Sequence, residues 1–472
     1  MSFFTAERVR SAAHGRWLVE PAGGGDAVGA SIDSRTIAPG QIFFALGGER
    51  TDGHRHVGQA AHAGAWVAVV ERDIDAAQLR NGCGVLVVEN VADALVGMAR
   101  AYRDTFVRTR VVAVTGSNGK TTATRMIDAA LGSSLRGSAS FKSFNNALGV
   151  PLTLLNARPG DDYLVCELGS NHPGEIERLA RIVRPHVAVI TSIARAHLEG
   201  FGSVAGVARE KGSLLGHVGS GGAAIVNGDV PELLAYASGA GTLVTFGERE
   251  GVDFRVTGVR HGTAGVSFTI DGIGSFKLAM LGGHNAINAA GALAVARWFG
   301  VDMEGAGAGL ARVEPPAMRL ERCTVGGVRV INDAYNANPD SMLAAIRTLG
   351  AVEGLGRKVV VLGDMLEIGH ERAERHREVA DALADDGSAS LAVLVGPLMR
   401  AAAARLHERW GDGRVVWIES LDGRGAAAAA SLIEAGDTVL LKGSRAVGVE
   451  RVLAALRADA ERMGGSVEMA DA

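Results

Sequence analysis

Short runs of apolar residues, many of them β-branched, alternate with longer amphipathic stretches along most of the chain. In the first hundred residues the apolar runs stand at 42–46, 66–71 and 84–90, and a helical pattern ends near "MARAYRDTF" (98–106). Strands that alternate with helices are typical of parallel sheets with helices on their faces. The pattern therefore predicts an α/β fold for this part of the chain.

The same alternation continues through the middle and the last third of the chain. Further strands are predicted at 111–116, 163–169, 187–193, 223–228, 328–335, 358–365, 391–396, 415–420 and 437–444. Residues 253–270 and 276–281 instead alternate with a period of two, which indicates an antiparallel extension of the sheet. A helix is predicted at 284–300. We expect a mostly parallel sheet in the middle of the chain and a doubly wound α/β arrangement after it.

Two breaks divide this pattern into three parts. A polar segment precedes Val111, and the adjacent Pro315 and Pro316 interrupt a helical stretch. A chain of 472 residues also exceeds the size of one ordinary core. We therefore predict a small N-terminal α/β domain at 1–106, a central domain at 107–314 and a C-terminal doubly wound domain at 315–472.

Composition narrows the class of protein further. Lys and Arg number 48 against 52 Asp and Glu, so the chain lacks the concentrated positive charge of nucleic-acid binders. The cysteines Cys83, Cys166 and Cys323 are far apart and odd in number, which disfavours a disulfide framework or a CxxC metal site. No apolar run approaches the roughly 18 residues of a spanning helix. We expect a soluble cytoplasmic protein with no nucleic-acid partner and no membrane insertion.

The stretch "VVAVTGSNGKTTATRM" (111–126) carries the clearest chemical signal. A strand runs into a Gly-rich turn and a helix, as in a phosphate loop, where backbone N–H groups face the phosphates, a Lys neutralises them and a hydroxyl reaches Mg²⁺. The strict P-loop pattern is not met, because its first position falls on Val114. A Gly-rich turn without a ligand is the alternative, and we favour a P-loop-type ATPase domain. The candidate residues are Gly116, Ser117, Asn118, Gly119, Lys120, Thr121 and Thr122.

Two acid–base side chains follow predicted strands of the same block. Glu167 ends the strand "YLVC", and His197 comes soon after "VAVITSI". Ligand sites of α/β sheets gather at the carboxyl ends of strands, so both could reach one crevice and help to hold Mg²⁺. The alternatives are a capping or surface carboxylate for Glu167 and a hydrogen-bonded loop residue for His197. Lys211, in "VAREKGSLLG", reads from chemistry alone as a surface lysine on a helix.

Taken together, the motifs resemble a known family. "TGSNGKTT" (115–122), "CELGSNHPGEI" (166–176), "AHLEGFGS" (196–203), "REKG" (209–212) and "GHNAINAAGALAVA" (283–296) stand in the order found in Mur ligases, the ATP-dependent amide-forming enzymes of peptidoglycan precursor synthesis. Four more stretches, at 31–57, 144–155, 331–342 and 361–376, resemble the branch that adds D-Ala-D-Ala.

This resemblance implies an activity and a role for each domain. The N-terminal domain would bind the uridine end of UDP-MurNAc-tripeptide, the central domain would bind ATP, and the C-terminal domain would complete the site for ATP and D-Ala-D-Ala. The enzyme would transfer the γ-phosphoryl group to the peptide carboxylate, and the amine of D-Ala-D-Ala would attack the acyl phosphate to give UDP-MurNAc-pentapeptide, ADP and phosphate. The family also implies two Mg²⁺ ions and carboxylation of Lys211 by CO₂. We also expect a monomer.

The resemblance also assigns residues. Catalysis would fall to Lys120, Glu167, His197, Lys211 and Arg319, and the Mg²⁺ ligands would be Thr121, Glu167, His197 and carbamylated Lys211. ATP would further contact Asn285 through its adenine, Arg319 through its phosphates and Asp333 through its ribose. The substrate contacts would be Ser34 and Arg35 for uridine, Asn145 and Asn146 for the muramoyl peptide, and Asn336, Asn338, Asp340 and Ser341 for the peptide or D-Ala-D-Ala.

Plainer interpretations stand beside these assignments. Asn285 could be a helix-capping residue, Arg319 an interdomain salt bridge, and the Asn-rich segment before Asp340 an ordinary turn. Two positions depart from the family pattern: Ser213 stands where an acidic residue is common after Lys-Gly, and Ala147 where Glu is more usual.

Three other classes of protein compete with this interpretation. A sister ligase that adds diaminopimelate would carry Arg where Asp340 stands, and folate polyglutamylating ligases lack the N-terminal uridine domain. A nucleotide-binding regulatory protein would keep the loop without turnover, which the joint presence of Lys120, Glu167, His197 and Lys211 disfavours.

Overall fold

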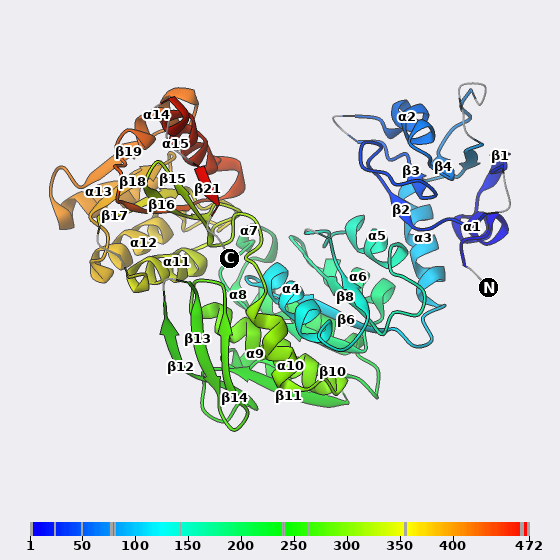
Figure 1. Ribbon diagram of the computed structural model, residues 1–472, viewed down its shortest axis with the longest axis horizontal. Coiled ribbons are helices and arrows are strands. Elements are labelled where there is room, and N and C mark those ends of the chain that lie inside the picture. The colour runs from blue at the N-terminus through cyan, green and yellow to red at the C-terminus, as the bar shows by residue number, and fades with distance from the viewer. Residues whose placement is uncertain are drawn as a thin grey trace.

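The computed structural model describes residues 3–22, 25–48, 51–75, 79, 82–141, 143–237, 239, 241–262, 264–353, 356–462 and 467–469. These residues form three sheets that follow one another along the chain, each with helices packed on it (Figure 1). Within this part of the chain, no helix is both long and apolar enough to cross a membrane.

The first sheet has five strands in the order β1-β5-β4-β3-β2. Strands β2 to β5 pair in parallel, and β1 runs antiparallel to β5. The elements are α1 (Ala6–Ala13), β1 (Arg16–Val19), β2 (Ala30–Ser31), β3 (Ile42–Phe44), α2 (Val57–His62), β4 (Val67–Val70), β5 (Gly84–Val87) and α3 (Val91–Arg103). The three strands and the helix expected in the first hundred residues are all present.

The second sheet has nine strands in the order β14-β13-β12-β11-β10-β9-β6-β8-β7. Strands β7 to β12 and β6 pair in parallel, whereas β12, β13 and β14 pair antiparallel, so the predicted antiparallel extension is confirmed. The strands are β6 (Arg110–Thr115), β7 (Gly137–Ala139), β8 (Tyr163–Glu167), β9 (Val187–Ile190), β10 (Ala223–Asn227), β11 (Thr242–Gly247), β12 (Phe254–His261), β13 (Val266–Ile270) and β14 (Gly274–Leu278).

Helices cover both faces of this second sheet. They are α4 (Lys120–Leu131), α5 (Gly149–Leu155), α6 (Glu175–Val183), α7 (Leu198–Phe201), α8 (Val204–Gly212), α9 (His284–Phe299) and α10 (Met303–Ala311). Successive side chains of β6 point to opposite faces: Val112 and Val114 pack with α4 and α9, whereas Val111 and Ala113 pack with α5 and α6. This burial on both sides explains the continuous apolar runs of the central strands.

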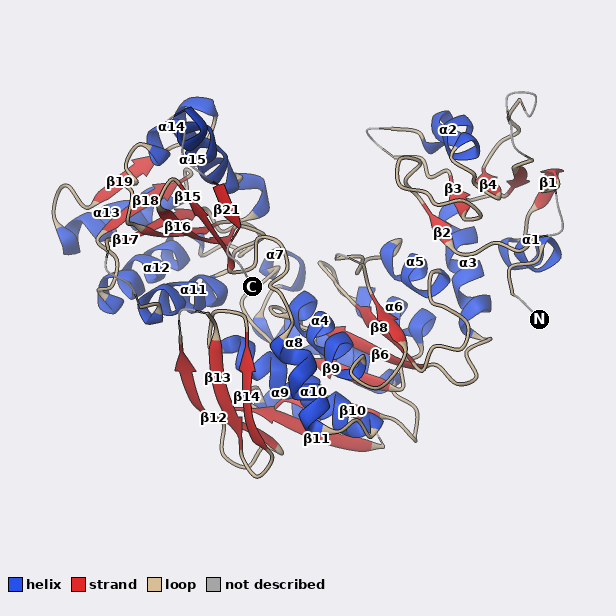
Figure 2. Ribbon diagram, viewed as in Figure 1, coloured by secondary structure: helices blue, strands red, loops and turns tan. Residues whose placement is uncertain are grey.

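The third sheet has seven strands in the order β19-β18-β17-β20-β16-β15-β21. Its strands are β15 (Glu321–Val325), β16 (Val328–Asp333), β17 (Lys358–Gly363), β18 (Leu391–Val395), β19 (Val415–Ile418), β20 (Thr438–Lys442) and β21 (Val467–Met469). Its helices are α11 (Pro339–Ala351), α12 (Arg372–Asp386), α13 (Met399–Trp410), α14 (Gly423–Ala430) and α15 (Glu450–Arg462). Helices α11, α12 and α13 lie on one face and α14 and α15 on the other (Figure 2), so the doubly wound arrangement is confirmed.

Buried polar bonds fix the first sheet to the second domain. At the end of α3, the Tyr102 hydroxyl donates to the carbonyl of Ala157 at 2.8 Å, and the Arg103 guanidinium donates to the carbonyls of Val183 and Arg184, both at 2.7 Å. The Asn156 amide, just past α5, donates to the carbonyl of Ala30 in β2 at 2.9 Å. The N-terminal and central parts are therefore joined by ordered contacts along α3 and β2.

Candidate active site

The phosphate loop connects β6 to α4 and depends on two glycines. Gly116 has φ +148° and Gly119 has φ +82°, both in the region that favours glycine. A Cβ atom on Gly116 would lie 2.1 Å from Thr191 Oγ1, and one on Gly119 would lie 2.6 Å from Asn288 Oδ1. The turn can therefore approach its neighbours this closely only with glycine at both positions.

The segment that follows β9 forms hydrogen bonds with this loop. The backbone N–H of Ser117 donates to the carbonyl of Ser192, and the N–H of Asn118 donates to Ser192 Oγ, both at 2.9 Å. At the start of α4, Lys120 Nζ donates to the Gly116 carbonyl at 2.8 Å. Burial lowers the pKa of Lys120, while the charge of Glu167 opposes that shift. The ammonium thus lies over the loop, where a phosphate group could exchange for these backbone contacts.

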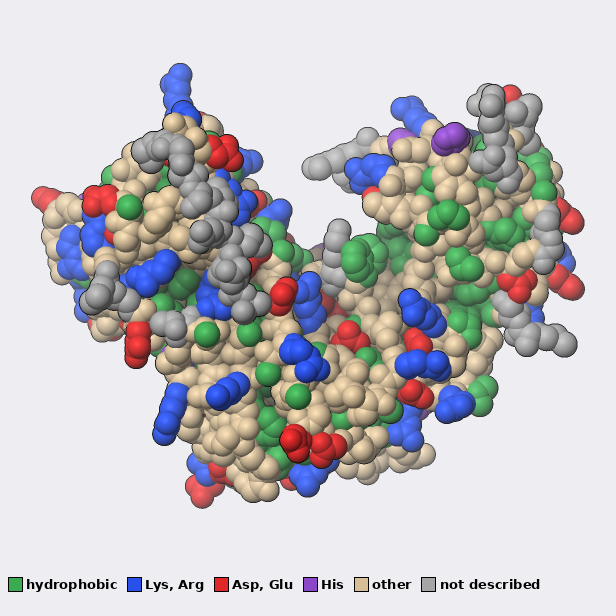
Figure 3. Space-filling model, in the orientation of Figure 1, with side chains coloured by type: hydrophobic (Ala, Val, Ile, Leu, Met, Phe, Trp, Pro, Cys, Tyr) green, Lys and Arg blue, Asp and Glu red, His purple; other side chains and the backbone are tan. Residues whose placement is uncertain are grey.

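The loop opens into a cavity of 1090 Å³ that all three domains line. Figure 3 shows the molecular surface hollowed between the first and third sheets, above the second. Most of the predicted site residues lie on its wall: Ser117, Asn118, Gly119, Lys120, Thr121, Thr122, Asn145, Asn146, Glu167, His197, Asn285, Arg319, Asp333, Asn336, Asn338, Asp340 and Ser341. The other predicted residues do not line it: Gly116, Lys211, Ser34 and Arg35.

Glu167, at the end of β8, is one of the acidic residues that line the cavity. Its side chain is 1% exposed, and Oε1 accepts a hydrogen bond from Asn145 Nδ2 at 2.7 Å. Oε2 is buried and has no hydrogen-bond partner within the described residues. A buried carboxylate oxygen without a partner is costly unless a ligand occupies it. No group of three or more His, Cys, Asp or Glu that could hold a metal occurs among the described residues.

His197 directly precedes α7, and Lys211 lies in the next helix, α8. His197 has φ +53° and its Nδ1 lies 2.6 Å from Glu367 Oε2 of the C-terminal domain. Burial lowers the pKa of His197, and Glu367 opposes that shift. Lys211 is 1% exposed, and its Nζ donates to Ser170 Oγ at 2.6 Å. Burial, with a smaller contribution from Lys120, lowers the pKa of Lys211 to about 7, so the interpretation of Lys211 as a surface residue is wrong.

Arg319 and Asp333 are two of the charged side chains that the C-terminal domain contributes to the cavity wall. Arg319 Nη2 donates to Thr121 Oγ1 at 3.0 Å, and its guanidinium lies 3.9 Å from the centroid of the Tyr335 ring. Within the described residues Arg319 makes no ion pair, so the interdomain salt bridge considered for it is absent. Asp333 accepts from the buried Lys442 Nζ at 2.6 Å. The domain interface therefore brings a guanidinium directly to the first turn of α4.

Asn285 lies near the start of α9 and does not cap it. Its Nδ2 donates to the Leu281 carbonyl at 2.7 Å, and its Oδ1 accepts from Asn288. Gly283 is the N-cap of α9, so the capping alternative for Asn285 is wrong. Burial lowers the pKa of the neighbouring His284 to about 4, which keeps this imidazole neutral near neutral pH. The start of α9 is therefore an uncharged, enclosed wall of the cavity.

The remaining candidates have structural partners of their own. Ser34 Oγ donates to Gln59 Oε1 at 2.9 Å, and Arg35 pairs with Asp33. Asn146 Oδ1 accepts from the backbone at the start of α5. Asn338 and Ser341 form the capping box of α11. The Asn336 side chain accepts from the N–H of Ala337.

Several residues of the site were not predicted from the sequence. They are Ser170 beside Lys211, Tyr335 beneath Arg319, Glu367 beside His197, Lys442 beside Asp333, and Arg195 beside Asp340. Lys442 and Glu367 follow the apolar runs of β20 and β17, so their position at strand ends was an available signal. Ser170, Tyr335 and Arg195 contact residues far from them in the sequence, and no local sequence pattern predicts such contacts.

Comparison with known proteins identifies the family. Residues 27–103 match the model of the Mur ligase family, catalytic domain, residues 114–296 the Mur ligase middle domain, and residues 318–445 the Mur ligase, glutamate ligase domain. The UDP-N-acetylmuramoyl-tripeptide–D-alanyl-D-alanine ligase of Bacillus subtilis is 39% identical over 360 residues, which cover 76% of this chain and 78% of that protein. The chain therefore belongs to the Mur ligase family.

Two solved MurF structures resemble this chain over most of its length. A crystal structure of MurF from Acinetobacter baumannii has a TM-score of 0.82 and 32% identity, covering 96% of this chain and 99% of that one. MurF ligase from Thermotoga maritima, solved in complex with ADP, has a TM-score of 0.76 and 28% identity, covering 92% of this chain and 98% of that one. The fold and the order of the three domains are those of the ligases that these two structures represent.

Proposed function

We propose that this chain is an ATP-dependent ligase that joins D-Ala-D-Ala to UDP-MurNAc-tripeptide in peptidoglycan precursor synthesis. The observation that carries the proposal is the single cavity in which the phosphate loop, Glu167 and Arg319 meet. The likeness to D-alanyl-D-alanine ligases over most of the chain supports the choice of substrates. The products would be UDP-MurNAc-pentapeptide, ADP and phosphate.

The residues of the cavity suit transfer of a phosphoryl group to a carboxylate. The loop N–H groups and Lys120 would hold the ATP phosphates, and Arg319 would neutralise charge on the transferred group. A carboxylate oxygen of the tripeptide attacks the γ-phosphorus, the bond to ADP breaks, and an acyl phosphate forms. The amine of D-Ala-D-Ala then attacks the acyl carbon, loses a proton, and expels inorganic phosphate. Positioning and charge neutralisation are the main tasks of the protein in this sequence.

The donor set fits Mg²⁺. Glu167 Oε2 is a buried oxygen without a partner among the described residues, and the Thr121 hydroxyl lies at the first turn of α4. Hard oxygen ligands of this kind are those that Mg²⁺ prefers, with waters and phosphate oxygens completing its shell. Thr121, Glu167 and His197 would contribute to two such sites. Bound Mg²⁺ would neutralise charge on the phosphates during transfer.

Lys211 fits conversion to a carbamate. A pKa of about 7 leaves a large neutral fraction of the amine near neutral pH, and only the neutral amine attacks CO₂. Attack forms an N–C bond and releases a proton, which replaces a buried cation by an anion with two oxygens. Those oxygens would support the metal sites, where an ammonium would repel them.

The domain roles form part of the same proposal. Residues 1–106 would bind the uridine end of the substrate, with Ser34 and Arg35 near it, residues 107–314 would bind ATP, and residues 315–472 would complete the ATP and D-Ala-D-Ala sites. Asn285 would contact adenine and Asp333 the ribose, while Asn145, Asn146 and Asn336 would face the peptide substrates. One chain supplies all of these groups, so the active unit would be a monomer, which light scattering of the purified chain would measure.

The test is ADP formation with Mg²⁺ and UDP-MurNAc-tripeptide, with D-Ala-D-Ala compared against single amino acids. We expect turnover only with the dipeptide, and a product mass equal to that of the pentapeptide nucleotide. Turnover with a single amino acid would instead assign the chain to another branch of the family. Absence of ADP with every amine would contradict the proposal.

A further inference from the structure

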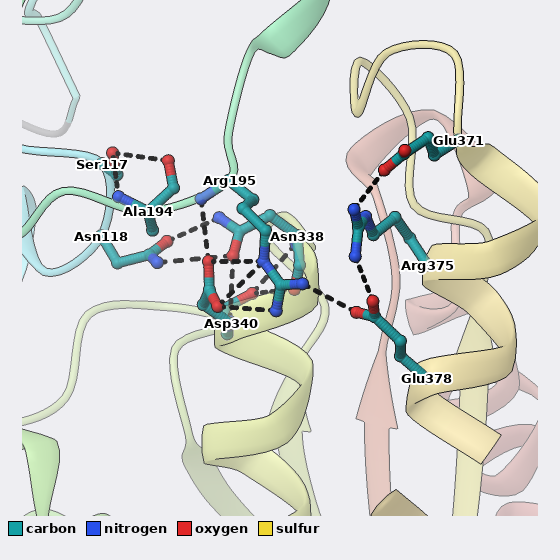
Figure 4. Close-up of polar contacts among 10 residues, drawn as sticks. Ser117, Asn118, Ala194, Arg195, Asn338, Asp340, Glu371, Arg375 and Glu378 are labelled. Carbon is teal, nitrogen blue, oxygen red and sulfur yellow. Dashed lines mark hydrogen bonds and ion pairs between the residues drawn. The ribbon is translucent and has the colours of Figure 1, made fainter. Parts of the chain in front are cut away.

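Arg195 is a charged residue beside the cavity for which the proposed reaction has no role. It lies in the segment that connects β9 to α7, two positions before His197. Its side chain points to the C-terminal domain, where α11 and α12 present carboxylates to it (Figure 4). It contributes no atom to the cavity wall, although its neighbours Ala194 and Ala196 do.

The contacts of Arg195 join the central domain to two helices of the C-terminal domain. Its backbone N–H donates to Asp340 Oδ2 at 2.8 Å, and its Nη2 donates to Asp340 Oδ1 at 2.9 Å. Its Nη1 donates to Glu378 Oε2 at 2.7 Å. Glu378 also pairs with Arg375, which pairs in turn with Glu371. One guanidinium thus bridges α11 and α12, in a fork that suits two carboxylates.

A second contact holds α11 from the phosphate loop. Asn338 Nδ2 donates to Asn118 Oδ1 at 2.8 Å, and Asn118 Nδ2 donates back at 3.4 Å (Figure 4). Asn338 is the N-cap of α11, and Asp340 lies in the first turn of that helix, where a carboxylate is favoured. The first turn of α11 is therefore held at two points by the central domain.

Both contacts with α11 come from parts of the central domain that are bonded to each other. The N–H of Ala194 donates to Ser117 Oγ at 2.9 Å, which ties the Arg195 segment to the phosphate loop. Asn118 is bonded to Ser192 of the same segment. Since α11 follows directly on Asp333, Tyr335 and Asn336, a shift of its first turn would move the C-terminal wall of the cavity.

We propose that Arg195 is a positioning residue: its ion pairs with Asp340 and Glu378 hold the first turn of α11 on the phosphate loop and keep the C-terminal domain docked on the central domain. Asp340 then serves as the partner of Arg195 instead of contacting the amine substrate. The side chains of Arg195, Asp340 and Glu378 are 24%, 38% and 32% exposed, so these pairs are accessible to solvent and their loss leaves no buried charge.

The test compares Arg195→Ala with the wild type by small-angle scattering, with and without an ATP analogue, and by steady-state kinetics; the kinetic part rests on the proposed function. We expect a larger radius of gyration in the variant. We also expect KM for ATP and for D-Ala-D-Ala to rise by about three- to tenfold, with kcat changed by less than about twofold. Without the ion pairs, part of the binding free energy of the substrates would be used to dock the C-terminal domain. Arg195→Lys should recover only part of the effect, because an ammonium lacks the fork that bridges two carboxylates.

Two further variants make the test specific. Asp340→Asn should reproduce part of the change, and in the double variant with Arg195→Ala it should add little, as expected for residues in contact. Arg405→Ala is the matched control, because Arg405 pairs with Asp381 inside the C-terminal domain. The control should match the wild type in scattering and in KM.

Three results would overturn the role of Arg195. They are an unchanged radius of gyration and KM in Arg195→Ala, an equal change in Arg405→Ala, or a fall in kcat at constant KM. Scattering does not depend on catalysis. An inactive wild type would therefore count against the proposed function, whereas unchanged compaction would count against the positioning role.

Discussion

At the scale of single residues, Lys211 shows how the surroundings of a side chain change its pKa. Its local sequence is that of an exposed helical lysine, yet its side chain is 1% exposed and contacts Ser170 and the ring of Phe201. Ser170 lies in the loop after β8 and Phe201 is the last residue of α7, so both partners come from outside α8 and the burial could not be predicted from that helix itself. Glu167 was predicted by its place at a strand end, which is a local signal.

Replacement of Lys211 should remove ligase activity. We expect Lys211→Ala to lower kcat by about 100-fold or more, on the scale seen when a supporting residue of a metal site is lost. A small carboxylate such as formate should restore part of the activity by supplying the missing oxygens, as measured by ADP release. The control is Lys277→Ala, on the exposed side of β14. Full activity in Lys211→Ala would exclude the carbamate role.

The pKa of Lys211 also predicts how stability depends on pH. The folded value is about 7 against an ordinary 10.5, so between these pH values the unfolded chain binds more protons, and stability from this group rises with pH. In CO₂-free buffer, Lys211→Met lacks this dependence. The free energy of unfolding of Lys211→Met minus that of the wild type should therefore be largest below pH 7. This difference should fall by roughly 3 to 5 kcal/mol between pH 7 and pH 10.5. Denaturant titrations at several pH values would measure it, and a constant difference would contradict the burial of this amine.

At the scale of elements, the strand–turn–helix of the phosphate loop is the best-predicted part of the structure. Its apolar strand, its glycines and the following helix all carry local signals. The elements that were not predicted include β1, β2, β7, β11, β15, β21, α1, α2 and α10. β2 and β7 have only two and three residues, and β7 is "GSA", so they depend on pairing with neighbouring strands for their conformation.

Substitution of Gly119 should disrupt this element. In Gly119→Ala the new Cβ would meet Asn288 Oδ1 at 2.6 Å, and φ is +82°. We expect a loss of about 1 to 3 kcal/mol in free energy of unfolding and a weaker affinity for ATP. Chemical denaturation and calorimetric titration with ATP would measure both. Gly216→Ala, where no atom lies within 4 Å of the new Cβ, should resemble the wild type; equal effects of the two substitutions would refute the steric argument.

At the scale of the whole molecule, the three domains are joined in two different ways. Buried hydrogen bonds at the end of α3 attach the N-terminal domain, whereas partly exposed ion pairs and the Asn118–Asn338 contact attach the C-terminal domain. The number of domains could be predicted from polar breaks and prolines. The contacts between them could not, because residues such as Asn118 and Asn338 are 220 positions apart.

Loss of the Arg103 side chain should loosen the N-terminal joint. Arg103→Ala would leave the carbonyls of Val183 and Arg184 without this donor in a buried place. We expect a loss of about 2 to 4 kcal/mol in free energy of unfolding, measured by denaturant titration. Arg10→Ala, on the exposed face of α1, serves as the control and should change stability by less than about 0.5 kcal/mol. A stability in Arg103→Ala equal to that of this control would show that α3 is held by other contacts.

The most direct test of the proposed activity is to follow an oxygen atom. UDP-MurNAc-tripeptide labelled with ¹⁸O in its reacting carboxylate is turned over with ATP, Mg²⁺ and D-Ala-D-Ala, and the released phosphate is analysed by mass spectrometry. An acyl phosphate transfers the attacking carboxylate oxygen to the phosphate, so the account predicts one ¹⁸O in each phosphate released. Phosphate without ¹⁸O would contradict it, because the γ-phosphoryl group would then have gone to water or to another acceptor.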